Sequence, residues 1–202
     1  MLREEPRHYN PKAFMLRAFI AIELSDDVRG ALADVQDRLK QVHTGGKVSW
    51  TKVENLHLTL QFLGDVREEQ VAGIAAALDQ VAGNQTRFVV SVGGVGAFPN
   101  GRVPRVLWVG CGAADGKLRT LAAAVRAAMG EWGFEPEQRE FVAHLTLGRV
   151  KFPRPDAALT RALDSLMDSA CGTLSVEVLH LFQSELHPQG SIYTKLSSHK
   201  LM

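Results

Sequence analysis

The amino-acid sequence predicts an α+β fold in which antiparallel sheets carry helices on their outer faces. Two observations favour this class. Strand-like apolar runs alternate with helix-like segments along the chain, and the tetrapeptide His-Leu-Thr-Leu occurs twice, at 57–60 and 144–147. The 202 residues are 46% hydrophobic and 22% charged, which is ordinary usage for a globular protein. A chain of this length suits one domain, or two small lobes that share a core.

The elements of the first half follow from local signals. Apolar, aromatic and β-branched residues at 16–24 predict a strand. Ser25 then offers an N-cap hydroxyl, and Asp26 and Asp27 favour the positive end of a helix that continues over 28–42. The further elements expected in this half are strands at 48–51, 56–63 and 88–95, and a helix at 68–82 ended by Gly83.

The second half repeats this order: a strand, a helix, a strand that carries His-Leu-Thr-Leu, and then a helix and strands. The expected strands lie at 103–110, 141–150, 174–185 and 192–196, and the expected helices at 116–132 and 156–169. This repetition of pattern and motif indicates an internal duplication. Residues 1–14 are polar and contain two prolines, so they are expected to be a flexible extension before one folded domain at 15–202.

Composition excludes several classes of protein. The formal net charge is +1, whereas a dedicated duplex binder usually has a clear basic excess. Cys111 and Cys171 lack CxxC spacing, which argues against a disulfide framework or a thiolate zinc site. No apolar run reaches the length of a membrane span, and the first residues lack the apolar core of a signal peptide. A cytoplasmic protein without membrane contact is therefore expected.

The two His-Leu-Thr-Leu strands carry the chemistry. Because side chains at i and i+2 of a strand point to the same face, His57 shares a face with Thr59, and His144 shares one with Thr146. The leucines between them point to the opposite, buried face. Two strands of this kind, in equivalent positions of the two halves, are far more informative than one. We therefore expect one site built from both.

This residue set favours acid–base chemistry on phosphate. Two imidazoles with pKa values near ~6.5 can act as base and acid at neutral pH, and threonine hydroxyls can donate to phosphate oxygens. Strands that face each other across a cleft would place the acid and the base on opposite sides of phosphorus. One histidine on each strand falls short of the three or four ligands usual for zinc, and no other motif completes the set. No metal is expected.

The paired motifs and their flanks resemble the 2H phosphoesterase superfamily, and most closely its RNA 2′,3′-cyclic phosphodiesterases, historically called 2′-5′ RNA ligases. The matching phrases are RAFIAIEL at 17–24, VENLHLTLQFLGDV at 53–66, GVGAFPNGRVPRVLWVG at 94–110, FVAHLTLGRVK at 141–151 and LFQSEL at 181–186. The resemblance implies a bilobal fold with two pseudo-symmetric lobes around a central cleft, each giving one motif strand. It also implies opening of RNA 2′,3′-cyclic phosphates to 2′-phosphates without metal, ATP or another cofactor.

The resemblance implies a role for each motif residue by its position. His57, Thr59, His144 and Thr146 match the motif residues. His57 is assigned to protonate the leaving 3′-oxygen and His144 to activate water, although the identical motifs leave these labels interchangeable.

Further residues belong to the same resemblance. It implies that Arg149 helps to hold phosphate, and that Phe19 stacks on the terminal base. On the residues alone, Phe19 fits the core of an apolar strand equally well, while Trp50 and Tyr193 have similar standing as cleft-wall aromatics. Gly148 stands where the family often has alanine.

Other functions remain open. The same site could carry out 2′-5′ RNA ligation, or act on a small cyclic phosphate such as ADP-ribose 1″,2″-cyclic phosphate. A non-catalytic module that binds RNA ends or nucleotides is a third possibility, which the presence of both His-Thr pairs disfavours. The expected partners are RNA ends or nucleotides with a 2′,3′-cyclic phosphate, and the chain is expected to be a monomer. The remaining histidines, at 43, 180, 187 and 199, are expected to be structural or exposed.

Overall fold

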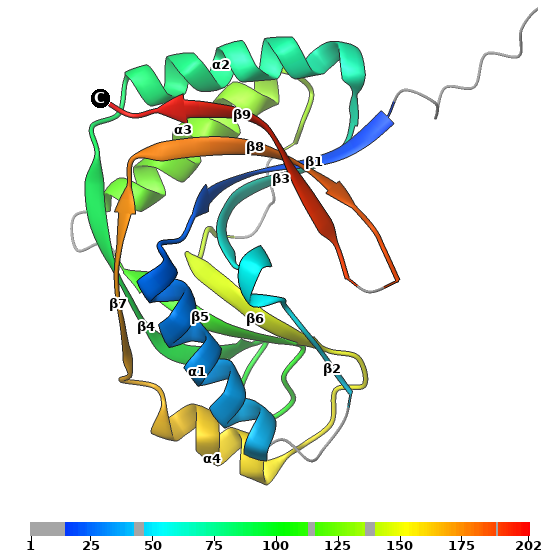
Figure 1. Ribbon diagram of the computed structural model, residues 1–202, viewed down its shortest axis with the longest axis vertical. Coiled ribbons are helices and arrows are strands. Elements are labelled where there is room, and N and C mark those ends of the chain that lie inside the picture. Colours follow the sequence, from blue (N-terminus) through cyan, green and yellow to red (C-terminus); the bar gives the residue numbers. More distant parts are fainter. Residues whose placement is uncertain (1–14, 43–46, 113–115, 136–139, 189) are drawn as a thin grey trace, which may run out of the picture.

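A computed structural model describes residues 15–42, 47–112, 116–135, 140–188 and 190–202. The expected N-terminal extension and His43 lie outside these residues. Within them, nine strands form a single curled antiparallel sheet (Figure 1). The strands are β1 (Met15–Glu23), β2 (Val48–Trp50), β3 (His57–Arg67), β4 (Phe88–Phe98), β5 (Val106–Gly112), β6 (His144–Val150), β7 (Ala170–Val176), β8 (Val178–Glu185) and β9 (Ile192–Lys200). The helices are α1 (Asp26–Val42), α2 (Val71–Gly83), α3 (Lys117–Glu131) and α4 (Ala157–Ser165), with short 3-10 turns η1 (Val53–Asn55) and η2 (Glu68–Gln70).

The strand order is symmetric about the centre of the sheet. It runs β7-β4-β5-β6-β3-β1-β8-β9, with β2 added beside β6. We call β3, β1, β8 and β9 the first lobe, and β6, β5, β4 and β7 the second lobe. They join at the centre, where Leu58 of β3 pairs with Leu145 of β6. The expected α+β fold with two pseudo-symmetric lobes is therefore confirmed.

The helices are exchanged between the lobes. Helix α1 follows β1 of the first lobe but packs against β7 and α4 in the second. Likewise, α3 follows β5 of the second lobe but packs against β3 and α2 in the first. Figure 1 shows α1 and α4 over one lobe and α2 and α3 over the other. Each half of the sequence thus contributes to both lobes, so neither lobe can form from one half alone.

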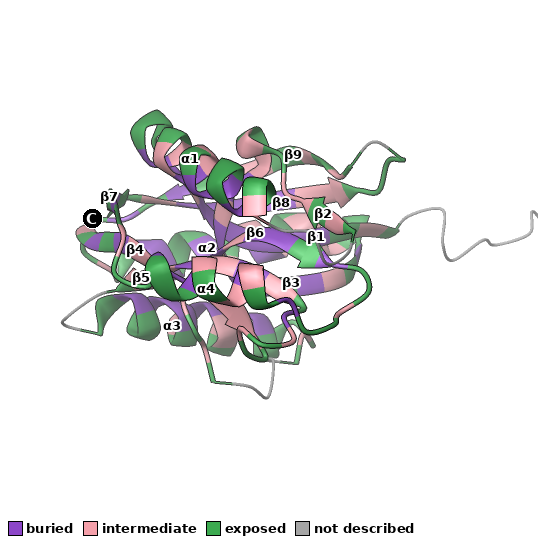
Figure 2. Cartoon of the chain, turned by 90° about the horizontal axis from the view of Figure 1, so that it is seen from below, coloured by how far each residue is buried: buried purple, intermediate pink, exposed green. Residues whose placement is uncertain are grey.

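The core lies between the sheet and these helices, where buried residues concentrate (Figure 2). The four motif leucines are buried there, Leu58, Leu145 and Leu147 at 0% exposure and Leu60 at 1%. Full burial of a leucine side chain stabilises a fold by roughly 1.5–3 kcal/mol. The motif strands are therefore fixed by their apolar faces, which leaves the polar faces free to form a site. Among the described residues, no helix combines the length and hydrophobicity needed to cross a bilayer.

The strand expected at 174–185 is the main error in the elements. The structure divides it at Glu177 into β7, which ends the second lobe, and β8, which lies inside the first. No glycine or proline interrupts this apolar run, so local sequence gives no sign of the crossing. Smaller shifts occur elsewhere. For example, β5 begins at Val106 because the Asn100 side chain accepts hydrogen bonds from the amides of Arg102 and Val103 in a turn.

Candidate active site

The two motif strands meet at the centre of the sheet. The antiparallel pair Leu58–Leu145 sets a register in which His57 lies opposite Thr146 and Thr59 lies opposite His144. The four polar side chains predicted to form one site therefore come from adjacent strands and share one face of the sheet. Beyond this single pair the strands separate, and a cavity of about 660 Å³ opens beside Thr59, His144 and Arg149.

Both histidine rings are held in the same way. Nδ1 of His57 lies 2.8 Å from the carbonyl oxygen of Asn55, and Nδ1 of His144 lies 2.7 Å from that of Val142. A carbonyl oxygen only accepts, so each Nδ1 carries the hydrogen and donates it to the residue two positions earlier. The Nε2 atom of each ring is then left for proton exchange with a substrate.

The surroundings of His57 are strongly apolar. Its ring centroid lies 4.7 Å from that of Phe19 and 5.3 Å from that of Tyr193. Burial lowers the pKa of His57 to about 4; the hydrogen bond to Asn55 opposes this effect in part, and the nearby positive charge of Arg29 adds to it. His57 is consequently neutral at pH 7, with an unprotonated Nε2.

Arg29 also positions the turn that leads into His57. Its Nη1 atom donates to the carbonyl oxygens of Val53, Glu54 and Leu56, at 3.1, 2.9 and 3.1 Å. One guanidinium of α1 thus gathers the carbonyl groups of η1 and the residue after it. Sequence reasoning missed Arg29, because its partners follow it by more than twenty positions and no local pattern links them.

His144 has fewer aromatic neighbours. Its ring contacts Phe98 edge-on, with 5.1 Å between centroids. Phe98 in turn packs against Trp108, whose indole covers Gly96 so closely that a Cβ there would lie 2.4 Å from the ring. The described lining of the cavity beside His144 includes Arg126, Glu135 and Glu140. His144 therefore stands on the wall of an open, partly polar cavity.

Matching β-bulges shape both motif strands. Thr59 pairs with Ala21 and Gln61 with Ile20, so Leu60 is an extra residue in β3. In β6, Thr146 pairs with Trp108 and Gly148 with Leu107, so Leu147 is the extra residue. A bulge shifts the alternation of side chains by one position. The residue three places after each threonine, Phe62 or Arg149, therefore joins the polar face.

These two residues differ in chemistry although their positions correspond. Phe62 and Arg149 are both exposed, Phe62 at 59%, and both line the cavity beside Thr59 and His144. Strict alternation would have turned Gln61 to this face instead. Phe62 is thus a site residue that the sequence did not reveal, because the bulge that exposes it has no glycine to announce it.

Phe19 lies elsewhere than a base-stacking role requires. It is 2% exposed and packs with Phe182 and Tyr193 against His57. A base could stack on its ring only after these neighbours moved, so the alternative of a core phenylalanine describes its position. Phe19 therefore packs against His57 as part of the core.

Gln36 and Gly148 hold β2 against the site. The buried amide of Gln36 donates to the carbonyl oxygens of Thr51 and Leu147, both at 2.8 Å. At Gly148, a Cβ would lie 2.9 Å from Val48 and 3.0 Å from Trp50. Gly148 therefore makes room for β2.

The other described histidines have structural surroundings or lie at the surface. His180 contacts Ser198 and Glu23, and His199 contacts Asp79 and Ser197. Within the described ranges, no three His, Cys, Asp or Glu residues come together as ligands for a metal ion. Cys111 and Cys171 are free, and burial raises the pKa of both thiols.

A duplicated sheet whose two His-x-Thr strands pair at its centre defines the two-histidine class of phosphoesterases. Comparison with known proteins agrees. The model of the LigT-like phosphoesterase family matches twice in succession, over residues 22–108 and 109–193. The chain belongs to this family, and the double match confirms the internal duplication.

Relatives of known name cover nearly the whole chain. An RNA 2′,3′-cyclic phosphodiesterase of Methanothermobacter thermautotrophicus is 35% identical over 92% of this chain and 99% of its own length. One from Aeropyrum pernix is 38% identical over 83% of this chain and 93% of its own. A solved structure from Thermus thermophilus superposes with a TM-score of 0.77 at 30% identity, covering 92% of this chain and 98% of that one. Escherichia coli LigT in complex with 3′-AMP shares the fold, with a TM-score of 0.70 at 23% identity over 93% of this chain and 98% of its own.

Proposed function

We propose that this protein hydrolyses RNA 2′,3′-cyclic phosphate ends to 2′-phosphates by two-histidine acid–base catalysis, without metal or ATP. The observation that carries the proposal is the matched pair of imidazoles. Each donates from Nδ1 to a backbone carbonyl, and each faces the threonine of the opposite motif strand. The names of the relatives supply the class of substrate.

The two histidines take opposite roles. His57 is neutral at pH 7 because its pKa is lowered to about 4, so its Nε2 accepts the proton of the attacking water. As water oxygen bonds to phosphorus, the bond from phosphorus to the 3′-oxygen breaks, and His144 gives a proton to that oxygen. The product carries a 2′-phosphate and a 3′-hydroxyl. This order reverses the roles assigned from the sequence.

The remaining site residues hold the phosphate and the base. Thr59 and Thr146 donate hydroxyl hydrogens to the non-bridging oxygens, and the Arg149 guanidinium binds two oxygens at once. The terminal base stacks on Phe62, whose ring is 59% exposed on the cavity wall.

We also propose that residues 15–202 work as one unit, as a monomer in the cytoplasm. The exchange of α1 and α3 between lobes supports the single unit. The two free cysteines, with thiol pKa values raised by burial, are compatible with a reducing compartment.

One assay tests the reaction. A short RNA with a 2′,3′-cyclic phosphate is incubated with the protein in EDTA, and the product is identified as a 2′- or 3′-phosphate. We expect a 2′-phosphate at an undiminished rate. A 3′-phosphate, or activity that returns only with a divalent ion, would contradict the proposal. Parallel reactions with a cyclic mononucleotide, with ADP-ribose 1″,2″-cyclic phosphate and with RNA that has a free 5′-hydroxyl separate the small-substrate and ligation alternatives.

A further inference from the structure

A second cavity leads away from the candidate site on the other side of Arg149. Its volume is about 600 Å³, and it lies between β2, the end of β6 and the turn between β8 and β9. Arg149 borders both this cavity and the one beside His144, and Tyr193, which contacts His57, lies in its wall. We call this second cavity the lysine groove, after Lys47, Lys52 and Lys151 in its lining.

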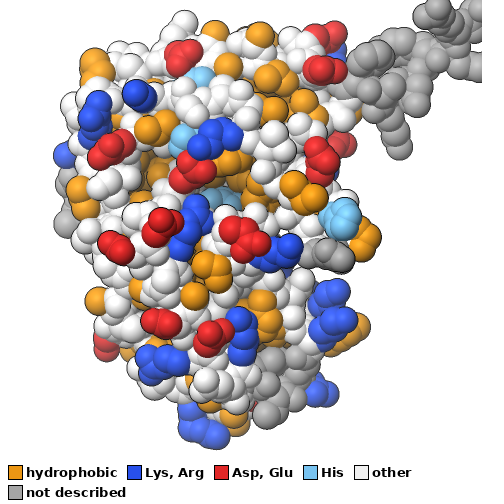
Figure 3. Space-filling model, viewed as in Figure 1, with side chains coloured by type: hydrophobic (Ala, Val, Ile, Leu, Met, Phe, Trp, Pro, Cys, Tyr) orange, Lys and Arg blue, Asp and Glu red, His pale blue; other side chains and the backbone are white. Residues whose placement is uncertain are grey.

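The lysine groove has one sign of charge. Lys47, Lys52, Arg149 and Lys151 are exposed in its wall, and its described lining contains no Asp or Glu. In the part of the chain that the structure describes, none of these four cations forms an ion pair. Figure 3 shows Lys and Arg side chains gathered on the right-hand edge of the molecule, at the level of β2 in Figure 1. A protein with a net charge of only +1 thus concentrates positive charge beside its site.

The strand register explains how this charge is aligned. Ser49 of β2 pairs with Arg149 of β6, and Val48 pairs with Val150. Lys47 and Lys151 are therefore opposite each other, with the Lys151 amide donating to the Lys47 carbonyl at 2.9 Å. Lys151 shares a face with Arg149 because it follows Arg149 by two positions. Lys47 lies on that face too, because it precedes Ser49, the partner of Arg149, by two positions. Like charges in opposite positions destabilise a strand pair, so this arrangement has a cost that an anionic ligand would remove.

The opposite wall of the groove is fixed to the catalytic strand. The Asn55 amide, beside His57, donates to the carbonyl oxygen of Ser191 in the β8–β9 turn at 2.7 Å. Lys52 reaches across to that turn, with its Cε 3.4 Å from the position of a Cβ on Gly190. The groove therefore has a set position relative to His57.

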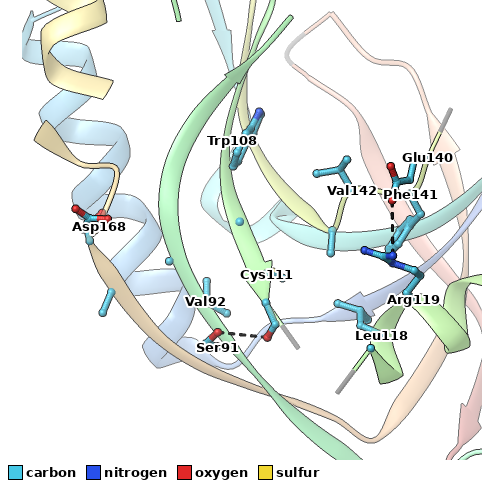
Figure 4. A pocket seen from close by; sticks show the side chains of 17 residues that line it. Ser91, Val92, Trp108, Cys111, Leu118, Arg119, Glu140, Phe141, Val142 and Asp168 are labelled. Atoms are coloured by element: carbon cyan, nitrogen blue, oxygen red, sulfur yellow. Dashed lines mark hydrogen bonds and ion pairs between the residues drawn. The ribbon is translucent and has the colours of Figure 1, made fainter. Parts of the chain in front are cut away.

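Another large cavity provides a contrast. It measures about 690 Å³ and is lined by Ser91, Trp108, Cys111, Arg119, Glu140 and Asp168, among others. Arg119 and Glu140 approach within 3.7 Å as an ion pair (Figure 4). Its charges are mixed, so it offers no path for an anion. Cavity size alone does not distinguish the lysine groove; its uniform charge does.

We propose that the lysine groove binds the phosphodiester backbone of the RNA strand that precedes the cyclic-phosphate end. This rests on the proposed function, in which the terminal phosphate sits between His57 and His144 beside Arg149. The preceding phosphates then follow the cations from Arg149 to Lys151, Lys47 and Lys52. Lysine and arginine contacts of this kind bind single strands without regard to sequence, and their strength falls as salt rises.

The test compares a long substrate with a short one. In the groove variant, Lys47, Lys52 and Lys151 are each replaced by Gln. The matched control replaces Arg38, Arg161 and Lys200, exposed cations on α1, α4 and the end of β9, in the same way. The substrates are an RNA hexamer with a 2′,3′-cyclic phosphate and adenosine 2′,3′-cyclic phosphate. We expect the groove variant to raise KM for the hexamer on the order of 10–100-fold at low salt. The salt slope of log KM should fall by about 2, since each contact to a single strand contributes roughly 0.7.

The mononucleotide should be hydrolysed by the groove variant within about twofold of the unaltered rate, and the control should behave like the unaltered protein with both substrates. Equal losses with both substrates, or a hexamer KM unchanged by the groove variant, would overturn the proposal.

A binding measurement separates this inference from the reaction itself. The Kd of a fluorescent RNA hexamer ending in a 2′-phosphate is measured by anisotropy for the same three proteins. The groove variant alone should bind more weakly, by a factor similar to its change in KM. If the unaltered protein hydrolysed no cyclic phosphate, the proposed function would fail, while this comparison would still decide the groove: equal Kd values in all three proteins would refute it.

Discussion

The two His-Leu-Thr-Leu strands are alike in backbone and different in surroundings. Both bury their leucines, both anchor Nδ1 on the carbonyl two residues earlier, and both have an extra residue at the second leucine. Their burial agrees over the seven residues that start at each histidine. The histidine and threonine are half-buried, the third residue after the threonine is exposed, and the other four residues are buried. Around this common frame, His57 packs against Phe19 and Tyr193, whereas His144 borders an open cavity.

This difference shows how a duplicated element can supply two distinct groups. A symmetric pair of histidines would have no reason to divide into acid and base. In the proposed mechanism the distinction comes from contacts that only one motif has: Phe19 and Tyr193 pack against the His57 ring, and Arg29 adds a positive charge beside it. The two motif strands provide the common geometry, and the residues packed around His57 provide the asymmetry.

The largest expected effect comes from removing each histidine. His57→Ala and His144→Ala should each lower kcat on the order of 10²–10⁴-fold, the usual size of a general acid–base contribution. The two variants should differ in pH dependence. Loss of the proposed base His57 should abolish the acidic limb of kcat/KM, whereas loss of His144 should leave that limb in place. Profiles with the opposite losses would restore the assignment made from the sequence, and near-full activity in both would remove the histidines from the mechanism.

The next comparison is between Arg149 and Phe62, each of which lies three residues after the threonine of its motif. Arg149→Met removes a charged contact to phosphate, worth about 1.5–3 kcal/mol, so kcat/KM should fall on the order of 10–100-fold for every substrate. Phe62→Ala removes a stacking surface, worth roughly 1–3 kcal/mol per base, and should mainly raise KM. Steady-state kinetics with a cyclic mononucleotide and with ribose 2′,3′-cyclic phosphate, which lacks a base, separate the two. Phe62→Ala should leave the ribose compound unaffected; an equal loss there would refute the stacking role.

The sequence predicted the polar faces of the site because strand alternation is local. His57 with Thr59 and His144 with Thr146 follow from spacing alone, and the structure places them on adjacent strands. The bulges at Leu60 and Leu147 are not visible locally, so alternation could not bring Phe62 to the site, and Arg149 came only from the resemblance. The division of the expected strand at Glu177 into β7 and β8 could not be predicted for the same reason. It depends on which lobe each segment joins, and an apolar run does not encode that choice.

The asymmetry between the histidines was also out of reach of the sequence. Identical motifs left the acid and base labels interchangeable, and the pKa of His57 depends on residues from both ends of the chain. Phe19 was expected to meet the base of the substrate, yet the same ring contributes to the asymmetry by burying His57. A long-range packing contact thus carries the information that separates the two proposed roles.

The smallest expected effect tests the source of this asymmetry. Arg29→Met removes the positive charge beside His57, so protonation of the ring becomes less costly and its pKa rises from about 4. The acidic limb of kcat/KM should move to higher pH. Arg29→Lys, which keeps the charge, is the control and should leave the limb near its original position. NMR titration of His57 checks the shift directly, and coincident titrations in all three proteins would show that Arg29 has no influence.

The same titration has a consequence for stability, with a definite sign. The folded pKa of His57, about 4, lies below the unfolded value of ~6.5. The stabilising contribution is therefore complete above the unfolded pKa and is lost as pH falls toward the folded one. Arg29→Met raises the folded pKa of His57 and so brings it closer to the unfolded value. The free energy of unfolding of this variant should therefore depend less steeply on pH between about 4 and 6.5. Denaturant melts across that range would measure the slope, and an unchanged slope would place the cause of the low pKa in the aromatic contacts alone.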